Sequence, residues 1–156
     1  MTATVRLPSA TLRAATAHHD ELLEQLTERV EALLDAVRSG SAPGPSRSAL
    51  LGFLRAELVP HLRIEADLLY RAVRTDKTAL LARAMQDEHR VIAASIHQVE
   101  QAVTSVDAAI AAGALVALCQ VRIAQENTHL LPALESAGLE LSDLLGSRPE
   151  LVGSTG

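Results

Sequence analysis

The feature that most constrains the fold is a helical repeat of apolar residues in four long segments of this 156-residue chain. In each segment apolar side chains recur every three or four residues, which is the period of an amphipathic α-helix. Helix-ending or turn residues separate the segments, among them Gly40, the stretch Ser41 to Ser46, and Gly138. We expect four helices, over about residues 9–40, 47–74, 76–105, and from 107 or 114 to 137.

Short connections between long helices favour antiparallel neighbours, so the pattern predicts an all-α, up-down-up-down four-helix bundle. The apolar residues are mainly Leu, Ala, Val and Ile, with one Phe, one Tyr and no Trp, a mixture that favours helices over strands. The length suits one domain, which we place at residues 1–145. A short helical turn over about 142–145 ends it, and residues 146–156 are expected to form a flexible tail.

Charge and cysteine content exclude several classes of protein. The net charge is −5 and the basic residues are interspersed with acidic ones, so we expect no nucleic-acid partner. The N-terminal stretch turns polar early, which predicts neither a secretory signal nor a membrane span. Cys119 is the only cysteine, so no intrachain disulfide is possible. A cytoplasmic protein is expected, and the pattern leaves the oligomeric state open.

His61 and Glu65 form the first candidate site. They are four residues apart on the second predicted helix and therefore project from the same face. Pro60 directly precedes them and predicts a kink. An imidazole with a nearby carboxylate suits a non-haem iron site in a bundle core, although a surface ion pair has the same spacing.

The other three helices each place a polar residue on their apolar face, at His19, His89 and Glu126. His18 is the alternative to His19 as the inward-facing imidazole. A buried ionisable group without a partner costs several kcal/mol, so a core that contains these groups needs a shared partner. A metal ion is the simplest one.

This arrangement resembles the hemerythrin-like (HHE cation-binding) family over about residues 11–137. The family pattern is a His on the first helix, H-x-x-x-E on the second, a His on the third and H-x-x-x-E on the fourth. The matching residues are His19, His61 with Glu65, His89 and Glu126. The phrases FLRAELVPH and AMQDEHRVI are similar to those of actinobacterial members.

The resemblance implies a non-haem di-iron site in which the three histidines are terminal ligands and the two carboxylates bridge the ions. Relatives use such a site for O2 binding, for iron or oxygen sensing, or for peroxide and nitric oxide chemistry. O2 or another small oxidant is therefore the expected ligand.

The chain departs from the family pattern at Arg122, which stands where the second H-x-x-x-E has its histidine. A guanidinium stays protonated and offers no lone pair to a cation. One of the two iron positions is therefore in doubt. Ala66 and Asn127 also replace the acidic residues that usually follow the ligand carboxylates. His129 lies three residues after Glu126, a spacing that ferritin-like di-iron bundles use, and is a further candidate ligand.

Four interpretations follow from this ligand set. The first is a protein with one or two non-haem irons that handles O2 or a related small oxidant. The second is an oxidative enzyme in which Arg122 holds an anionic substrate beside the metal. The third is a haem-binding bundle with histidine as axial ligand, and the fourth is a metal-free regulatory module. The residues leave open whether the protein is an enzyme.

Overall fold

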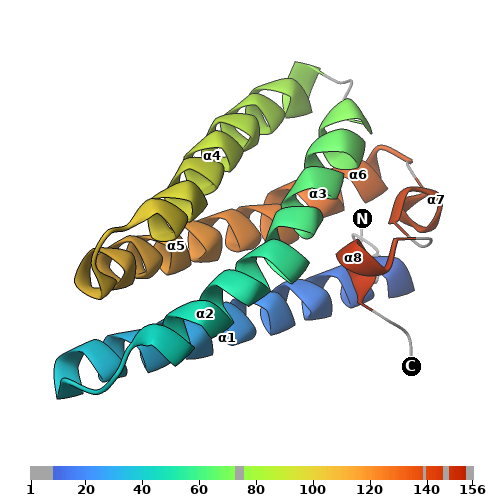
Figure 1. Ribbon diagram of the computed structural model, residues 1–156. Helices are drawn as coiled ribbons and strands as arrows, with labels where there is room; N and C mark the ends of the chain where they lie inside the picture. The colour runs from blue at the N-terminus through green and yellow to red at the C-terminus, as the bar shows by residue number, and fades with distance from the viewer. Residues whose placement is uncertain (1–8, 73–75, 139, 146–147, 154–156) are drawn as a thin grey trace.

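A computed structural model of the protein describes residues 9–72, 76–138, 140–145 and 148–153. Within these ranges the chain is helical and contains no strand, which confirms the all-α prediction. Figure 1 shows four long helical runs packed lengthwise, with two short helices against one end. The runs are α1 (Ala10–Ser39), α2–η1–α3 (Gly44–Phe53, Leu54–Leu58, Val59–Ala72), α4 (Asp76–Gln101) and α5–η2–α6 (Ser105–Gln125, Glu126–Leu130, Leu131–Ser136).

Local capping explains where the helices begin and end. The Ser9 hydroxyl accepts a hydrogen bond from the Leu12 amide at 3.1 Å and starts α1. Gly40 ends α1 in the left-handed conformation at φ 69°. Thr104 caps α5 by accepting from the Asp107 amide, so this helix starts slightly earlier than predicted.

The second run also starts earlier than predicted, at Gly44 rather than Arg47. Pro45 stands in its first turn, where the missing amide hydrogen of proline leaves no hydrogen bond unmade.

Two prolines interrupt the long runs, and a π-helical segment precedes each. The Val59 amide bonds to Leu54 O, and the Leu131 amide bonds to Glu126 O. Each of these bonds spans five residues instead of four, so the turn before Pro60 and Pro132 is widened. The predicted irregularity at Pro60 therefore includes a wider turn next to the candidate site.

The apolar core consists of two clusters along the bundle. The larger one joins α1, α2, η1, α3, α4 and α5, with Leu26, Leu33 and Leu115 among its fully buried members. The smaller one joins the starts of α1 and α4 to η2, α6, α7 (Leu141–Leu145) and α8 (Pro149–Val152), with Leu130 and Leu134 among its buried members. Along α1, the buried His19 lies between residues of the smaller cluster and residues of the larger one, and Arg122 and Glu126 lie likewise along the α5–η2 run.

The helical run Ser105–Ser136 also has the length and composition of a membrane span, because an 18-residue window within it has a mean hydropathy of 1.7. It carries Arg122 and Glu126, both buried against the other helices of the bundle. Core helices of bundles share this composition.

The C-terminal residues differ from the prediction of a flexible tail. Residues 149–152 form α8, which packs against α1 and α3 beside the short helix α7. Residues 146–147 and 154–156 lie outside the described part of the chain.

Candidate metal centre

The centre of the site is the pair His61 and Glu65 on α3. The two side chains are only 3% and 1% exposed, and His61 Nε2 lies 2.8 Å from Glu65 Oε1. The i, i+4 spacing places them one helical turn apart on the inward face. The surface ion pair that this spacing also allowed is therefore not what the structure shows.

His19 on α1 completes a group of three possible ligands. Its Nε2 lies 3.2 Å from Glu65 Oε1 and 3.7 Å from Glu126 Oε2. One donor atom from each of His19, His61 and Glu65 lies within 4.8 Å of the other two, which is close enough for all three to hold one ion. His19, rather than His18, is the inward-facing imidazole.

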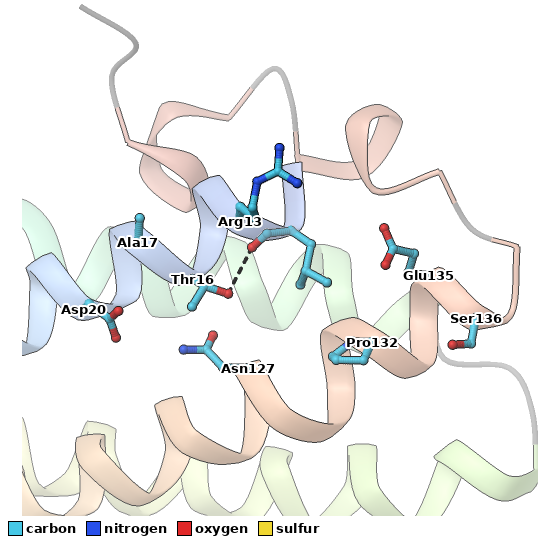
Figure 2. Close-up of a pocket in the computed structure, with 9 residues that line it drawn as sticks. Arg13, Thr16, Ala17, Asp20, Asn127, Pro132, Glu135 and Ser136 are labelled. Atoms are coloured by element: carbon cyan, nitrogen blue, oxygen red, sulfur yellow. Dashed lines mark hydrogen bonds between the residues drawn. The ribbon is translucent and has the colours of Figure 1, made fainter. Parts of the chain in front are cut away.

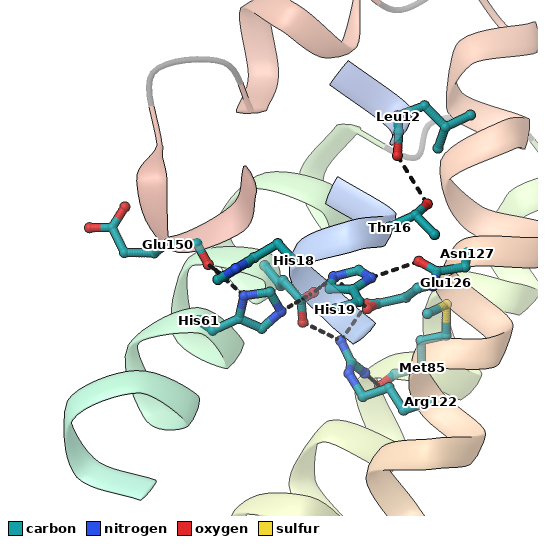
Figure 3. A network of polar contacts seen from close by, with 11 residues as sticks. Leu12, Thr16, His18, His19, His61, Met85, Arg122, Glu126, Asn127 and Glu150 are labelled. Carbon is teal, nitrogen blue, oxygen red and sulfur yellow. Dashed lines mark hydrogen bonds and ion pairs between the residues drawn. The ribbon is translucent and has the colours of Figure 1, made fainter. Parts of the chain in front are cut away.

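The second ring nitrogen of each histidine is fixed by an oxygen acceptor (Figure 3). His19 Nδ1 lies 2.7 Å from Asn127 Oδ1, and His61 Nδ1 lies 2.5 Å from the carbonyl oxygen of Glu150. Because a carbonyl oxygen only accepts, Nδ1 carries the hydrogen in both rings. In each ring Nε2 is the nitrogen that faces Glu65 Oε1, and it is the one that would give its lone pair to a metal ion, as in histidines that bind metals.

Arg122 on α5 lies in the same buried layer. Its Nη2 donates to Glu65 Oε2 at 3.0 Å and to Glu126 Oε1 at 2.7 Å, and its Nη1 donates to Met85 O at 3.1 Å. With 2% exposure it is among the largest fully buried side chains. The guanidinium therefore joins the two carboxylates that the family resemblance assigns as bridging ligands.

The charges of the carboxylates differ because their surroundings differ. Burial tends to raise the pKa of Glu65, but His61, His19 and Arg122 together hold this pKa well below its ordinary value. Burial and the negative charge of Glu65 raise the pKa of Glu126 well above its ordinary value, against the effect of Arg122. Glu65 is therefore the ionised carboxylate of the pair.

His19 carries a proton more readily than an ordinary histidine. Burial acts to lower its pKa, but the hydrogen bond and charge of Glu65, with the hydrogen bond to Asn127, raise it overall. A proton on Nε2 satisfies the contact between His19 and Glu65, and a metal ion at the same place would replace that proton.

Two observations are consistent with a metal ion among these residues. Glu126 Oε2 is buried and has no hydrogen-bond partner among the described residues, so an acceptor is available beside His19. A small internal cavity of about 10 Å³, enough for one water-sized species, also lies at the site. Its lining includes His61, Glu65, Arg122 and Glu126.

The structure does not bring His89 or His129 into this group. His89 on α4 is half-buried and lines a cavity of about 450 Å³ between α3 and α4, together with Leu62 and Ala66. His129 lies on η2 with its side chain exposed to solvent. The described ligand group thus contains three of the six predicted metal ligands, and Glu126 lies directly beside it.

Asn127 and Glu150 are functional residues that sequence reasoning missed. In the sequence, Asn127 stands out only because it replaces an acidic residue of the family pattern, yet in the structure its amide oxygen orients His19. It also lines a surface cavity of about 580 Å³ between α1 and α6 (Figure 2). The position of Asn127 directly after Glu126 is the sequence feature that could have indicated this contact. The contact of Glu150 uses a main-chain oxygen, so no feature of the sequence indicates it.

Comparison with known proteins agrees with this geometry. Residues 11–134 match the family model of the hemerythrin HHE cation-binding domain. The matched range includes every residue of the buried site except Glu150. No curated protein and no solved structure matches the chain. The family match, which covers most of the chain, shows that this protein belongs to the hemerythrin HHE cation-binding domain family.

Proposed function

We propose that the protein binds a single iron ion through His19, His61 and Glu65, and that it handles O2 or a related small oxidant there. The observation that supports this most directly is that His19, His61 and Glu65 each offer one ligand atom within 4.8 Å of the other two. Two histidines and one carboxylate are the ligands of many non-haem Fe(II) proteins that activate O2. Iron bound there would supply the redox chemistry.

Arg122 is the reason to propose one ion rather than two. It engages Glu65 Oε2 and Glu126 Oε1, oxygens that a second ion would need as ligands. Its positive charge, held 2.7–3.0 Å from both carboxylates, also repels a second cation. One divalent ion with Arg122 brings three positive charges to the site, whereas two ions with Arg122 would bring five.

The size of the site supports a small ligand. The internal cavity of about 10 Å³ suits a water molecule, and a diatomic ligand would need only slightly more room.

The two other interpretations of the ligand set have less support. Since Arg122 already donates to two carboxylates and to Met85 O, the structure gives no support to an anionic substrate bound by its guanidinium. The rings of His19 and His61 are 5.1 Å apart with Glu65 between their Nε2 atoms, an arrangement that leaves no room for a haem plane.

A metal-free module is the second candidate, and the same arginine favours it. Arg122 and a protonated His19 together can neutralise the buried carboxylates without an ion. The two proposals therefore differ in the number of metal ions that the purified protein binds: one ion per chain or none.

Metal analysis separates these proposals. Protein purified without oxygen and loaded with Fe(II) should bind one iron per chain, and His61→Ala and Glu65→Gln should each abolish loading. Exposure to O2 or nitric oxide should then change the absorption spectrum of the loaded protein only. Two irons per chain would contradict the single-ion site, and no bound iron at micromolar Fe(II) would favour the metal-free module.

A further inference from the structure

We propose that residues 148–153, which we call the C-terminal clasp, are a positioning element of the metal site. The carbonyl oxygen of Glu150 holds His61 in the tautomer that presents Nε2 to the ion, so that metal affinity depends on docking of the clasp. This inference rests on the proposed function for its effect on metal binding. The hydrogen bond itself can be tested without metal.

Two imidazoles from different helices converge on the Glu150 carbonyl (Figure 3). His61 Nδ1 on α3 lies 2.5 Å from this oxygen, and His18 Nε2 on α1 lies 3.0 Å from it. The His18 and His61 rings meet edge to face with centroids 5.4 Å apart. A carbonyl oxygen has two lone pairs and can accept both hydrogen bonds.

Apolar burial and a local cap hold the clasp in place. Leu151 is 2% exposed and belongs to the same cluster as Leu12, Leu130 and Leu134. The Gly153 amide donates to Pro149 O at 2.8 Å and closes the single turn of α8. The Glu150 carbonyl is therefore presented to His61 by a docked turn.

Gly153 lies close to His18. It has a φ of 74°, and a Cβ atom at this position would lie 3.5 Å from His18 Nδ1. A Cβ atom would thus be in van der Waals contact with the His18 ring, and the backbone conformation itself disfavours L residues.

The clasp is outside the part of the chain that matches the family, which ends at residue 134. The acceptor for the His61 Nδ1 hydrogen bond is thus added to the family domain by a segment of this chain. Groups that orient a metal-binding histidine typically change metal affinity by about 10- to 100-fold when they are lost. Because linkage is reciprocal, bound metal should also favour the docked clasp.

Two substitutions in the full-length chain test the proposal without touching His61. Leu151→Asp places a charge in the apolar cluster and should release the clasp. Gly153→Val should displace it through backbone strain and contact with His18. Glu150→Ala is the matched control, because it removes only an exposed side chain and keeps the carbonyl. Circular dichroism would show that the four-helix domain is still folded in each variant.

The first measurement is the nitrogen NMR spectrum of the histidine rings in metal-free protein. We expect His61 to carry a hydrogen-bonded, slowly exchanging Nδ1–H in the wild type and in Glu150→Ala, and to lose this protected hydrogen in both clasp variants. The second is Fe(II) affinity under anaerobic conditions, by competition with a chromophoric chelator. Both clasp variants should bind Fe(II) about 10- to 100-fold more weakly, still at one ion per chain.

The outcomes separate the two proposals. A protected Nδ1–H of His61 that is unchanged in both folded clasp variants overturns the positioning role, whether or not metal binds. Fe(II) affinity equal to that of the wild type overturns the dependence on docking while leaving the proposed function intact. If the wild type binds no Fe(II), the proposed function fails and the dependence of affinity on docking fails with it. A lost Nδ1–H hydrogen bond would still show that the Glu150 carbonyl orients His61.

Discussion

Arg122 donates to Glu65 Oε2 at 3.0 Å, while the two histidines of the site contact only Oε1 of the same carboxylate. The two oxygens of Glu65 thus contact different groups: Oε2 binds a permanent cation, and Oε1 contacts the histidines proposed as metal ligands. This arrangement has consequences for the metal content and the stability of the protein.

Arg122→His should raise the metal content from one to two ions per chain. The change removes the guanidinium that engages Glu65 Oε2 and Glu126 Oε1, and it places an imidazole four residues before Glu126. Elemental analysis after Fe(II) loading measures the content. Arg122→Lys is the control, because it keeps a positive charge and should not gain an ion. A content of one iron in Arg122→His would show that Arg122 does not exclude the second.

Arg122→Met should destabilise the metal-free protein by about 3–5 kcal/mol, because it leaves two buried carboxylates without their partner. Urea denaturation of protein stripped of metal measures the loss. The matched control is Arg38→Met, at an exposed arginine near Asp35, which should change stability by less than about 0.5 kcal/mol. A loss below about 1 kcal/mol in Arg122→Met would contradict the role of Arg122 as the resident cation.

The core of the site could be predicted from the sequence because helix geometry is local. The spacing of His61 and Glu65 fixes their shared face, and the apolar stripes of α1 and of the α5–η2 run place His19 and Glu126 inward. The family pattern then indicated that the four residues meet. In the structure, His19 contacts both carboxylates and His61 contacts Glu65, so the four residues do lie together.

The remaining features depend on distances that periodicity does not encode. His89 lies on the expected helix, yet its half-buried ring lines the cavity between α3 and α4. The acceptors of the His19 and His61 Nδ1 hydrogens come from residues 108 and 89 positions away. The Glu150 contact in particular uses a backbone oxygen, which any residue at position 150 would supply.

The stability of the metal-free protein should fall as the pH rises from 6 to 8.5. The pKa values of His19 and Glu126 are raised above their ordinary values of 6.5 and 4.5. Each group therefore contributes stability that is complete below its unfolded pKa and is lost as the pH rises through its folded pKa. The lowered pKa of Glu65 acts oppositely, since its contribution is lost only as the pH falls below 4.5.

Urea denaturation at constant ionic strength over this pH range measures the trend. Glu126→Gln removes one of the two groups and should flatten the pH dependence. The affinity for Fe(II) should change in the other direction and increase with pH, because protons leave His19 and Glu126 when metal binds. A metal-free protein that is as stable at pH 8.5 as at pH 6 would contradict the assigned protonation states.

Cys119 should resist thiol reagents in the folded protein. Burial raises the pKa of its thiol to about 12; the positive charge of Arg122 acts against this increase, and the negative charge of Glu65 adds to it. Since the thiolate is the reactive form and the side chain is 3% exposed, modification requires the bundle to open. Labelling with dithionitrobenzoate at pH 8 should therefore be slow in buffer and fast in denaturant.

Val103→Cys adds a thiol at a position that is 92% exposed and provides an internal control for this labelling. The variant should react with one equivalent at once and with the second only on unfolding, and two equally fast thiols would show that the core around Arg122 opens readily.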